Sequence, residues 1–118
     1  MFGLDGREAT SGSSDNDTTA GWLSSERSRS ERKSALRYLG TDGREAVWSV
    51  IRLVLSSVAG TAIVPMQDAL GLGSEARMNT PASTENNWRW RMREDQLNPR
   101  LASKLREMNS IYGRGRKR

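Results

Sequence analysis

Residues 41–65 read TDGREAVWSVIRLVLSSVAGTAIVP, and this stretch decides the fold class. Its first part carries apolar residues at helical spacing, which predicts a helix over 44–58 with Val58 on the apolar face. Asp42 and Glu45 are the predicted caps, and Gly60 is the predicted stop. Residues 61–65 then form a short β-branched run of strand length that ends in a proline. A helix followed directly by such a strand indicates an α/β layer, with a parallel strand that is covered on both faces.

Two further helices are expected outside this central stretch. Residues 25–40 contain Ser28 and Glu31 in a capping-box pattern, and Gly40 is the stop. Residues 98–113 begin with Asn98 as the cap and Pro99 at the first helical position, and they end at a glycine. The remaining segments are expected to be irregular or extended: a loose stretch at 1–13, a long loop with one helical turn at 66–87, and a half-buried extended segment at 87–95.

Composition limits the possible chemistry. The chain has 118 residues, of which 35% are hydrophobic, and it contains neither cysteine nor histidine. Disulfides, thiolate metal sites and histidine acid–base catalysis are therefore excluded, and any acid–base chemistry has to rely on carboxylates. The first 14 residues lack the apolar run of a signal peptide. The most apolar stretch contains Arg52 and Pro65, so we expect a soluble, cytoplasmic protein without membrane contact.

The net charge of +5 first suggests a nucleic-acid binder. However, four of the 19 basic residues lie in the last five positions, and without them 15 basic residues face 14 acidic ones. We therefore expect a solvated basic tail at 114–118. The segment WRWRMR at 88–93 has two interpretations: aromatic stacking beside phosphate contacts, or a strand that packs through one face. The second requires no partner, and nucleic acid is not favoured.

The loop at 13–22, SSDNDTTAGW, is too polar to be core and leaves three interpretations open. The first is a solvated turn. The second is a calcium loop, because Asp15, Asp17 and Thr19 fall at positions one, three and five, but Ala20 stands where the sharp turn requires glycine. The third is part of a sugar-cleaving active site. No metal ion or other cofactor is expected.

The third interpretation comes from a resemblance. SSDNDTTAGW resembles the THDNDTT-GW segment of the amylomaltases, the 4-alpha-glucanotransferases that are also called disproportionating enzymes. Residues 51–81 are similar to the last barrel strand of that family and its following loop, and NNWRWRM at 86–92 and LASKLREMNSIYGR at 101–114 resemble its C-terminus. The resemblance divides the chain into a flexible, unmatched segment at 1–12, the C-terminal part of a catalytic barrel at 13–113, and the basic tail.

The resemblance implies an α/β fold, namely the C-terminal segment of a (β/α)₈ TIM barrel. It also implies an enzyme that transfers a segment of a 1,4-alpha-D-glucan to an acceptor glucose or glucan by a retaining mechanism. A complete barrel needs roughly 250 residues, so we expect a fragment that is inactive without the missing barrel portion. The nucleophile and the acid–base carboxylate of the family align with no residue here. The alternative is a small, basic, non-enzymatic binding protein from a truncated gene.

The resemblance also assigns site residues. Asp15 aligns with the carboxylate that stabilises the transition state, and Asp17 is expected to be structural. Ser14 stands where the family pattern has a histidine, and Ala82 stands where it has a glycine. The residues expected to bind the glucan are Ser14, Gln67, Asp68 and Asn79.

Among these, Asn79 is the strongest candidate for a substrate hydrogen bond. Gln67 and Asp68 directly follow the predicted strand, where barrel enzymes place their active groups. An ion pair between Asp68 and Arg77 that fixes the loop is the structural alternative.

Overall fold

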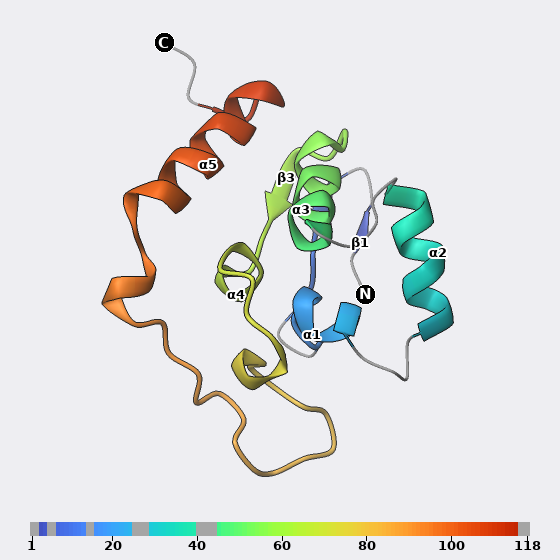
Figure 1. Cartoon of the computed structure of the whole chain (residues 1–118), viewed down its shortest axis with the longest axis vertical. Helices are drawn as coiled ribbons and strands as arrows, with labels where there is room; N and C mark the ends of the chain where they lie inside the picture. Colours follow the sequence, from blue (N-terminus) through green and yellow to red (C-terminus); the bar gives the residue numbers. More distant parts are fainter. Residues whose placement is uncertain (1–2, 5–6, 14–15, 25–28, 40–44, 116–118) are drawn as a thin grey trace.

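The structure is a computed structural model that describes residues 3–4, 7–13, 16–24, 29–39 and 45–115 (Figure 1). Within these residues, two short strands come first, three helices follow, and a third strand leads into the C-terminal turns and helices. In chain order the elements are β1 (Gly3–Leu4), β2 (Glu8–Thr10), α1 (Thr19–Ser24), α2 (Arg29–Leu39), α3 (Ala46–Ser56), β3 (Thr61–Ile63), α4 (Met66–Ala69), the 3₁₀ turns η2 (Ser74–Ala76) and η3 (Glu94–Gln96), and α5 (Pro99–Ile111).

The strands form one sheet in the order β1-β2-β3. β2 and β3 are parallel, with Glu8 opposite Thr61 and Thr10 opposite Ile63, which confirms the predicted parallel strand. β1 is antiparallel to β2. The expectation that residues 1–13 are loose is wrong for both β1 and β2. These strands are too short to show periodicity in the sequence, and Ala9 is buried because it packs against Val54 across the layer.

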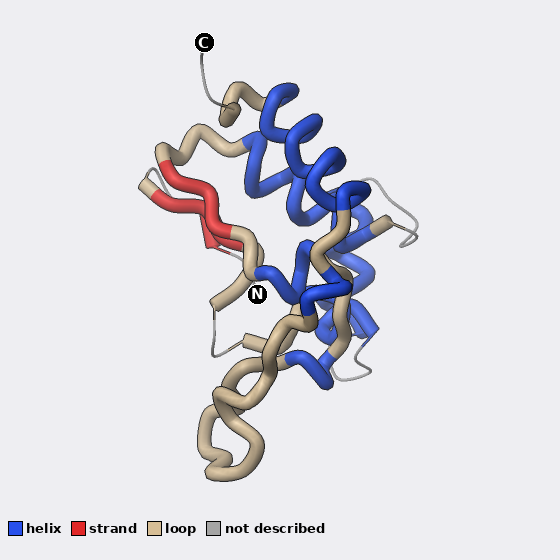
Figure 2. The backbone as a smooth tube through the Cα atoms, turned by 90° about the vertical axis from the view of Figure 1, so that its left-hand side faces the viewer, coloured by secondary structure: helices blue, strands red, loops and turns tan. Residues whose placement is uncertain are grey.

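Helix α3 organises the rest of the chain. It lies on one face of the sheet, with the other helices on the same side (Figure 2), and it contacts α1, α2, α4 and α5. Val54 packs with Ala9 and Ala59 beneath the sheet. Ile51 and Leu55 pack against Met108 of α5. The central helix–strand unit predicted from the sequence is therefore confirmed.

The ends of α3 differ from the prediction. The helix stops at Ser56, so Val58 lies beyond it and is 95% exposed instead of joining the apolar face. Glu45 occupies the N-cap position but makes no side-chain capping bond, and Asp42 lies outside the described residues. The caps of α3 were predicted from residue type, and residue type alone does not fix side-chain geometry.

The sheet is covered on one face only within the described residues, against the prediction of two covered faces. Along β3, Ala62 is half-buried toward α3, whereas Thr61 and Ile63 are exposed, the latter to 43%. The strand thus has an apolar side chain on a face that nothing in the described chain covers.

The other two long helices confirm their predictions. α2 lies within 25–40, although its predicted cap Ser28 and stop Gly40 are outside the described residues. In α5, the Asn98 side chain accepts a hydrogen bond from the Leu101 amide (3.0 Å), and Pro99 is the first helical residue. Gly113 has a φ of 69°, the left-handed conformation that glycine adopts readily after a helix.

Arg114 is an exception to the predicted solvated tail. Its guanidinium donates hydrogen bonds to the carbonyls of Leu55 (2.7 Å), Ser57 (3.0 Å) and Ala59 (2.9 Å). These carbonyls lie at the C-terminal end of α3, where backbone acceptors lack helical partners and a cation is favourable. Arg114 therefore fixes the end of α5 to the end of α3.

The segment between η2 and α5 runs away from the helical layer (Figures 1 and 2). Residues 87–95 do not form the predicted extended segment. Asn86 and Trp88 have φ values of 59° and 60°, which break a strand, and Trp88 is 55% exposed. In the described part of the chain, no helix is long and apolar enough to cross a membrane.

Candidate functional site at the carboxyl ends of the parallel strands

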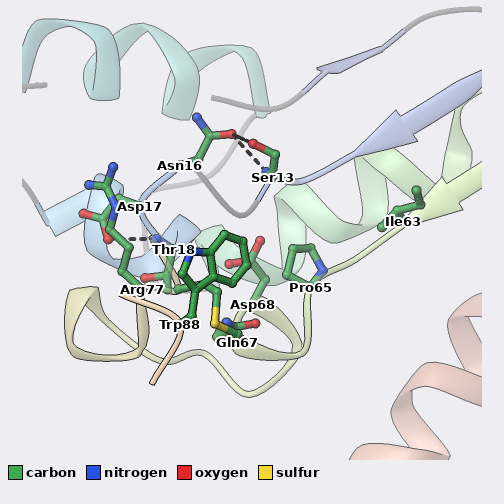
Figure 3. A pocket seen from close by; sticks show the side chains of 12 residues that line it. Ser13, Asn16, Asp17, Thr18, Ile63, Pro65, Gln67, Asp68, Arg77 and Trp88 are labelled. Carbon is green, nitrogen blue, oxygen red and sulfur yellow. Dashed lines mark hydrogen bonds between the residues drawn. The ribbon is translucent and has the colours of Figure 1, made fainter. Parts of the chain in front are cut away.

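A pocket of about 310 Å³ opens where β2 and β3 end (Figure 3). Parallel strands end at the same edge of a sheet, and α/β proteins place ligand sites among the loops that follow there. Three segments supply the lining: Gly12, Ser13, Asn16, Asp17 and Thr18 after β2; Ile63, Pro65, Gln67 and Asp68 at the end of β3 and beyond; and Arg77, Met78 and Trp88 from the long loop.

The loop after β2 is shaped by a turn around Asn16. The Asn16 side-chain oxygen accepts hydrogen bonds from the backbone amide (2.9 Å) and hydroxyl (3.0 Å) of Ser13, while the Asn16 amide donates to the Ser13 carbonyl (3.1 Å). Ser14 and Asp15 follow Ser13 in the sequence but lie outside the described residues. The predicted roles of Asp15 in catalysis and of Ser14 in glucan binding therefore stay predictions.

The end of this loop is fixed at the start of α1. Thr18 caps the helix by accepting a bond from the Gly21 amide (3.0 Å). The Asp17 carboxylate accepts bonds from the Thr18 amide (2.8 Å) and from the Ser74 hydroxyl (2.8 Å), which agrees with its structural interpretation. A Cβ atom at Gly21 would lie 2.6 Å from Oδ1 of Asp17 and in contact with Oγ of Ser74. Any larger residue at position 21 would therefore force the Asp17 and Ser74 side chains to move.

Asp68 is the most buried charged group of the pocket. Its side chain is 2% exposed. Oδ1 accepts a hydrogen bond from the Thr19 amide (2.8 Å), and Oδ2 accepts bonds from the hydroxyls of Thr19 (2.7 Å) and Ser11 (2.5 Å). The predicted ion pair with Arg77 is wrong, because these donors occupy the carboxylate instead. A buried carboxylate without such donors would be strongly destabilising.

The structure brings together only some of the residues predicted to bind the glucan. Gln67 and Asp68 line the pocket, and the Gln67 amide donates to the Ala76 carbonyl (3.3 Å). Asn79 is half-buried and is not among the described lining residues, while its carbonyl accepts a bond from Nε of Arg77 (2.9 Å). Two of the predicted residues therefore share the pocket, with Asp68 turned toward its own chain.

Sequence reasoning missed Trp88, which was assigned to packing. Its indole lines the pocket (Figure 3), and its backbone amide donates to the Met78 carbonyl (2.6 Å). The sequence also did not predict that Ser11 and Thr19 bind Asp68, because the only signal is a hydroxyl residue near each end of an acidic loop.

No group of three or more metal-ligating side chains occurs in the described segments. The calcium interpretation depends on Asp15, which those segments do not include.

Fold and site together define an α/β protein with a polar pocket at the carboxyl ends of parallel strands. A family model described as 4-alpha-glucanotransferase matches residues 7–98, and the chain belongs to this family. The match begins before β2, which the sequence analysis left outside the resemblance.

Individual relatives agree with this assignment. The chain is 49% identical over 104 residues to the 4-alpha-glucanotransferase of Synechocystis sp., covering 87% of this chain and 20% of the relative. It is 46% identical over 108 residues to the chloroplastic/amyloplastic enzyme DPE1 of Arabidopsis thaliana, covering 88% and 19%. The solved amylomaltase of Streptococcus agalactiae in complex with acarbose superposes with a TM-score of 0.83 at 34% identity, covering 92% of this chain and 22% of that one. The chain thus spans about a fifth of the length of these relatives.

Proposed function

We propose that this chain forms one side of the active site of a 4-alpha-glucanotransferase, as the C-terminal segment of its (β/α)₈ barrel. The observation that carries the proposal is the match to the amylomaltase structure over 92% of the chain. The local fold supports it, because β2, the following helices and β3 make a parallel crossover with the helices on one face of the sheet. The uncovered face with Ile63 would then point into the barrel.

The reaction would transfer a segment of a 1,4-alpha-glucan to an acceptor glucose or glucan with retention of configuration. Such enzymes use a nucleophilic carboxylate and an acid–base carboxylate about 5 Å apart. Both would come from the barrel portion outside these residues, which is a required partner. This chain would supply Asp15, whose negative charge favours the developing oxocarbenium ion more than the ground-state sugar. Carboxylates suffice for this chemistry, so no cofactor is proposed.

The glucan would occupy the pocket beside Gln67 and Trp88. The Gln67 side chain has a carboxamide oxygen that can accept from a sugar hydroxyl, and the exposed indole of Trp88 offers an apolar face with a polar edge. Ser14 and Asn79 keep their predicted roles as glucan ligands. The acarbose in the amylomaltase structure makes this inhibitor the natural probe for the site.

The alternative of a basic, non-enzymatic binding protein receives less support. The Arg91 guanidinium donates to the carbonyls of Trp88 (3.1 Å) and Trp90 (2.9 Å), and Arg114 is bound to α3. Two of the arginines that would contact phosphates are therefore used by their own chain.

A cytoplasmic location is part of our proposal. Imaging of a tagged chain would test it against the plastid location in the name of the Arabidopsis thaliana relative.

The decisive experiment replaces the matching segment of the complete Synechocystis enzyme with residues 7–98. We expect the graft to convert maltotriose into glucose and longer maltodextrins, and the isolated chain to do neither. Asp15→Asn in the graft removes charge but keeps shape, and turnover should fall by roughly 10²-fold or more. Asp17→Asn is the matched control and should mainly lower stability. If the Asp15→Asn graft stays within a fewfold of its parent, the proposed role of Asp15 is wrong.

A further inference from the structure

We propose that Asp68 is a positioning residue that fixes both ends of the loop carrying Asp15. This inference rests on the proposed function for its catalytic consequence, although its structural part stands without it. Asp68, Ser11 and Thr19 are named the Asp68 clamp. The role differs from the direct glucan contact predicted from the sequence.

The clamp joins segments that are distant along the chain. Ser11 directly follows β2 and opens the loop, and Thr19 closes it as the first residue of α1. Both donate to the same carboxylate across sequence separations of 57 and 49 residues. Asp68 itself lies in α4, just after β3. The amide of Ser11 also donates to the Ile63 carbonyl (3.3 Å), so both strand ends share this anchor.

The Asp68 carboxylate has little hydrogen-bonding capacity left for a sugar hydroxyl. An ionised carboxylate only accepts hydrogen bonds, and both Asp68 oxygens already accept from the protein. Ser11 is 1% exposed, Thr19 is 1% exposed and Asp68 is 2% exposed, so the three side chains are closed to solvent. A sugar hydroxyl could reach the carboxylate only by displacing a buried donor, which would then lose its partner.

The clamp fixes the two described ends of the loop that carries Asp15. Asp68 accepts hydrogen bonds from Ser11 at one end and from Thr19 at the other, and the Ser13–Asn16 bonds add a turn within the loop. A catalytic group on such a loop depends on this placement, because a shift of about 1 Å from the productive geometry can cost roughly 10²-fold in rate. Loss of the clamp should therefore impair turnover more than substrate binding.

The structural part is tested in the full 118-residue chain by amide hydrogen exchange with residue resolution. Asp68→Asn keeps one acceptor oxygen but turns a donor toward the hydroxyls. Exchange at Thr19 and in the segment 11–18 should accelerate at least 10-fold, while α5 stays unchanged. Asp95→Asn is the matched control, because this carboxylate is 74% exposed and pairs only with Arg93 among the described ion pairs. Unchanged exchange in the loop of the Asp68 variant would overturn the proposal.

The catalytic part is tested in the graft with maltotriose, normalised to the folded fraction. Asp68→Asn should lower kcat by roughly 10- to 100-fold and leave KM within about threefold. Thr19→Val removes one clamp donor and should lower kcat more than Thr19→Ser, which keeps the hydroxyl. A raised KM at unchanged kcat would show that Asp68 binds the sugar, and a loss proportional to unfolding would show a merely structural residue. Either result overturns the proposal.

The two proposals fail in different ways. An inactive parent graft, or one insensitive to Asp15→Asn, contradicts the proposed function, while the exchange experiment still decides whether Asp68 fixes the loop. An active graft whose kcat is unaffected by Asp68→Asn contradicts the positioning role alone.

Discussion

The pocket has two walls that are built differently. The clamped wall, residues 11–13, 16–19 and 63–68, contains the buried polar side chains Ser11, Thr18, Thr19 and Asp68, and its bonds cross up to 57 residues of sequence. The outer wall, residues 77–91, is mostly exposed, and the hydrogen bonds described at its tip are short-range. Examples are the Thr80 amide to the Asn87 side chain (2.9 Å) and the Asn87 side chain to the Ser83 carbonyl (2.7 Å).

Under the proposed function, this difference would separate two tasks of a site that transfers glucan segments. A group that stabilises a transition state needs fixed geometry, which the clamped wall provides through a network that involves the sheet and two helices. A surface that accepts glucans of different lengths benefits from local freedom, and segments with few buried contacts open most easily. The comparison predicts that matched substitutions have large effects in the clamped wall and small effects in the outer wall.

The largest effect is expected for Gly21→Ala in the clamped wall. The new Cβ would meet the Asp17 carboxylate and the Ser74 hydroxyl at less than contact distance, so these side chains must move and lose their mutual hydrogen bond, or α1 must shift. Overpacking of this kind costs about 1–3 kcal/mol of unfolding free energy, measurable by urea denaturation of the 118-residue chain. Gly115→Ala is the control, because nothing lies within 4 Å of its Cβ position. Equal stability of the two variants would remove the steric argument for Gly21.

A smaller effect is expected when one hydroxyl is removed from each wall. Thr19→Val preserves shape but takes one of three donors from the buried Asp68 carboxylate. Because the Ser11 hydroxyl and the Thr19 amide still donate to it, the loss should be about 1 kcal/mol, the contribution of one hydrogen bond. Thr80→Val removes an exposed hydroxyl in the outer wall and should change stability by less than about 0.5 kcal/mol. Both are compared by urea midpoints at a constant m-value. Similar losses of unfolding free energy in the two variants would mean that the two walls are equally fixed, which would contradict the proposed difference between them.

The smallest effect, with the opposite sign, is expected for Ala82→Gly in the outer wall. Ala82 has a φ of 66°, a left-handed conformation that costs an L-residue about 1–2 kcal/mol. The greater unfolded-state entropy of glycine offsets about 0.5–1 kcal/mol of this, so a net gain of roughly 0.5 kcal/mol should remain. Ala102→Gly, at an exposed position inside α5, should instead destabilise by about 1 kcal/mol. A destabilised Ala82→Gly variant would contradict the left-handed backbone.

The parts of the molecule differ in how well the sequence predicts them. α3 was predictable from its apolar periodicity, and α5 from its cap Asn98 with Pro99, because both are local signals. The resemblance identified the acidic loop, and the family match agrees with it. The partners of Asp68 were not predictable, because proximity to Ser11 and Thr19 arises only when β2 and β3 pair. The position of Trp88 was missed because a positive φ on a bulky residue has no signature in residue type.

Arg114 sets how far the chain can be shortened from its C-terminal side. Its guanidinium satisfies the carbonyls of Leu55, Ser57 and Ala59 and thereby fastens α5 over Ile51 and Leu55. Deletion of residues 115–118 keeps Arg114 and its three hydrogen bonds. Deletion of residues 114–118 removes them, so three carbonyls at the end of α3 lose their partner and α5 loses its attachment there. Tolerance to truncation should therefore fall in a single step rather than gradually.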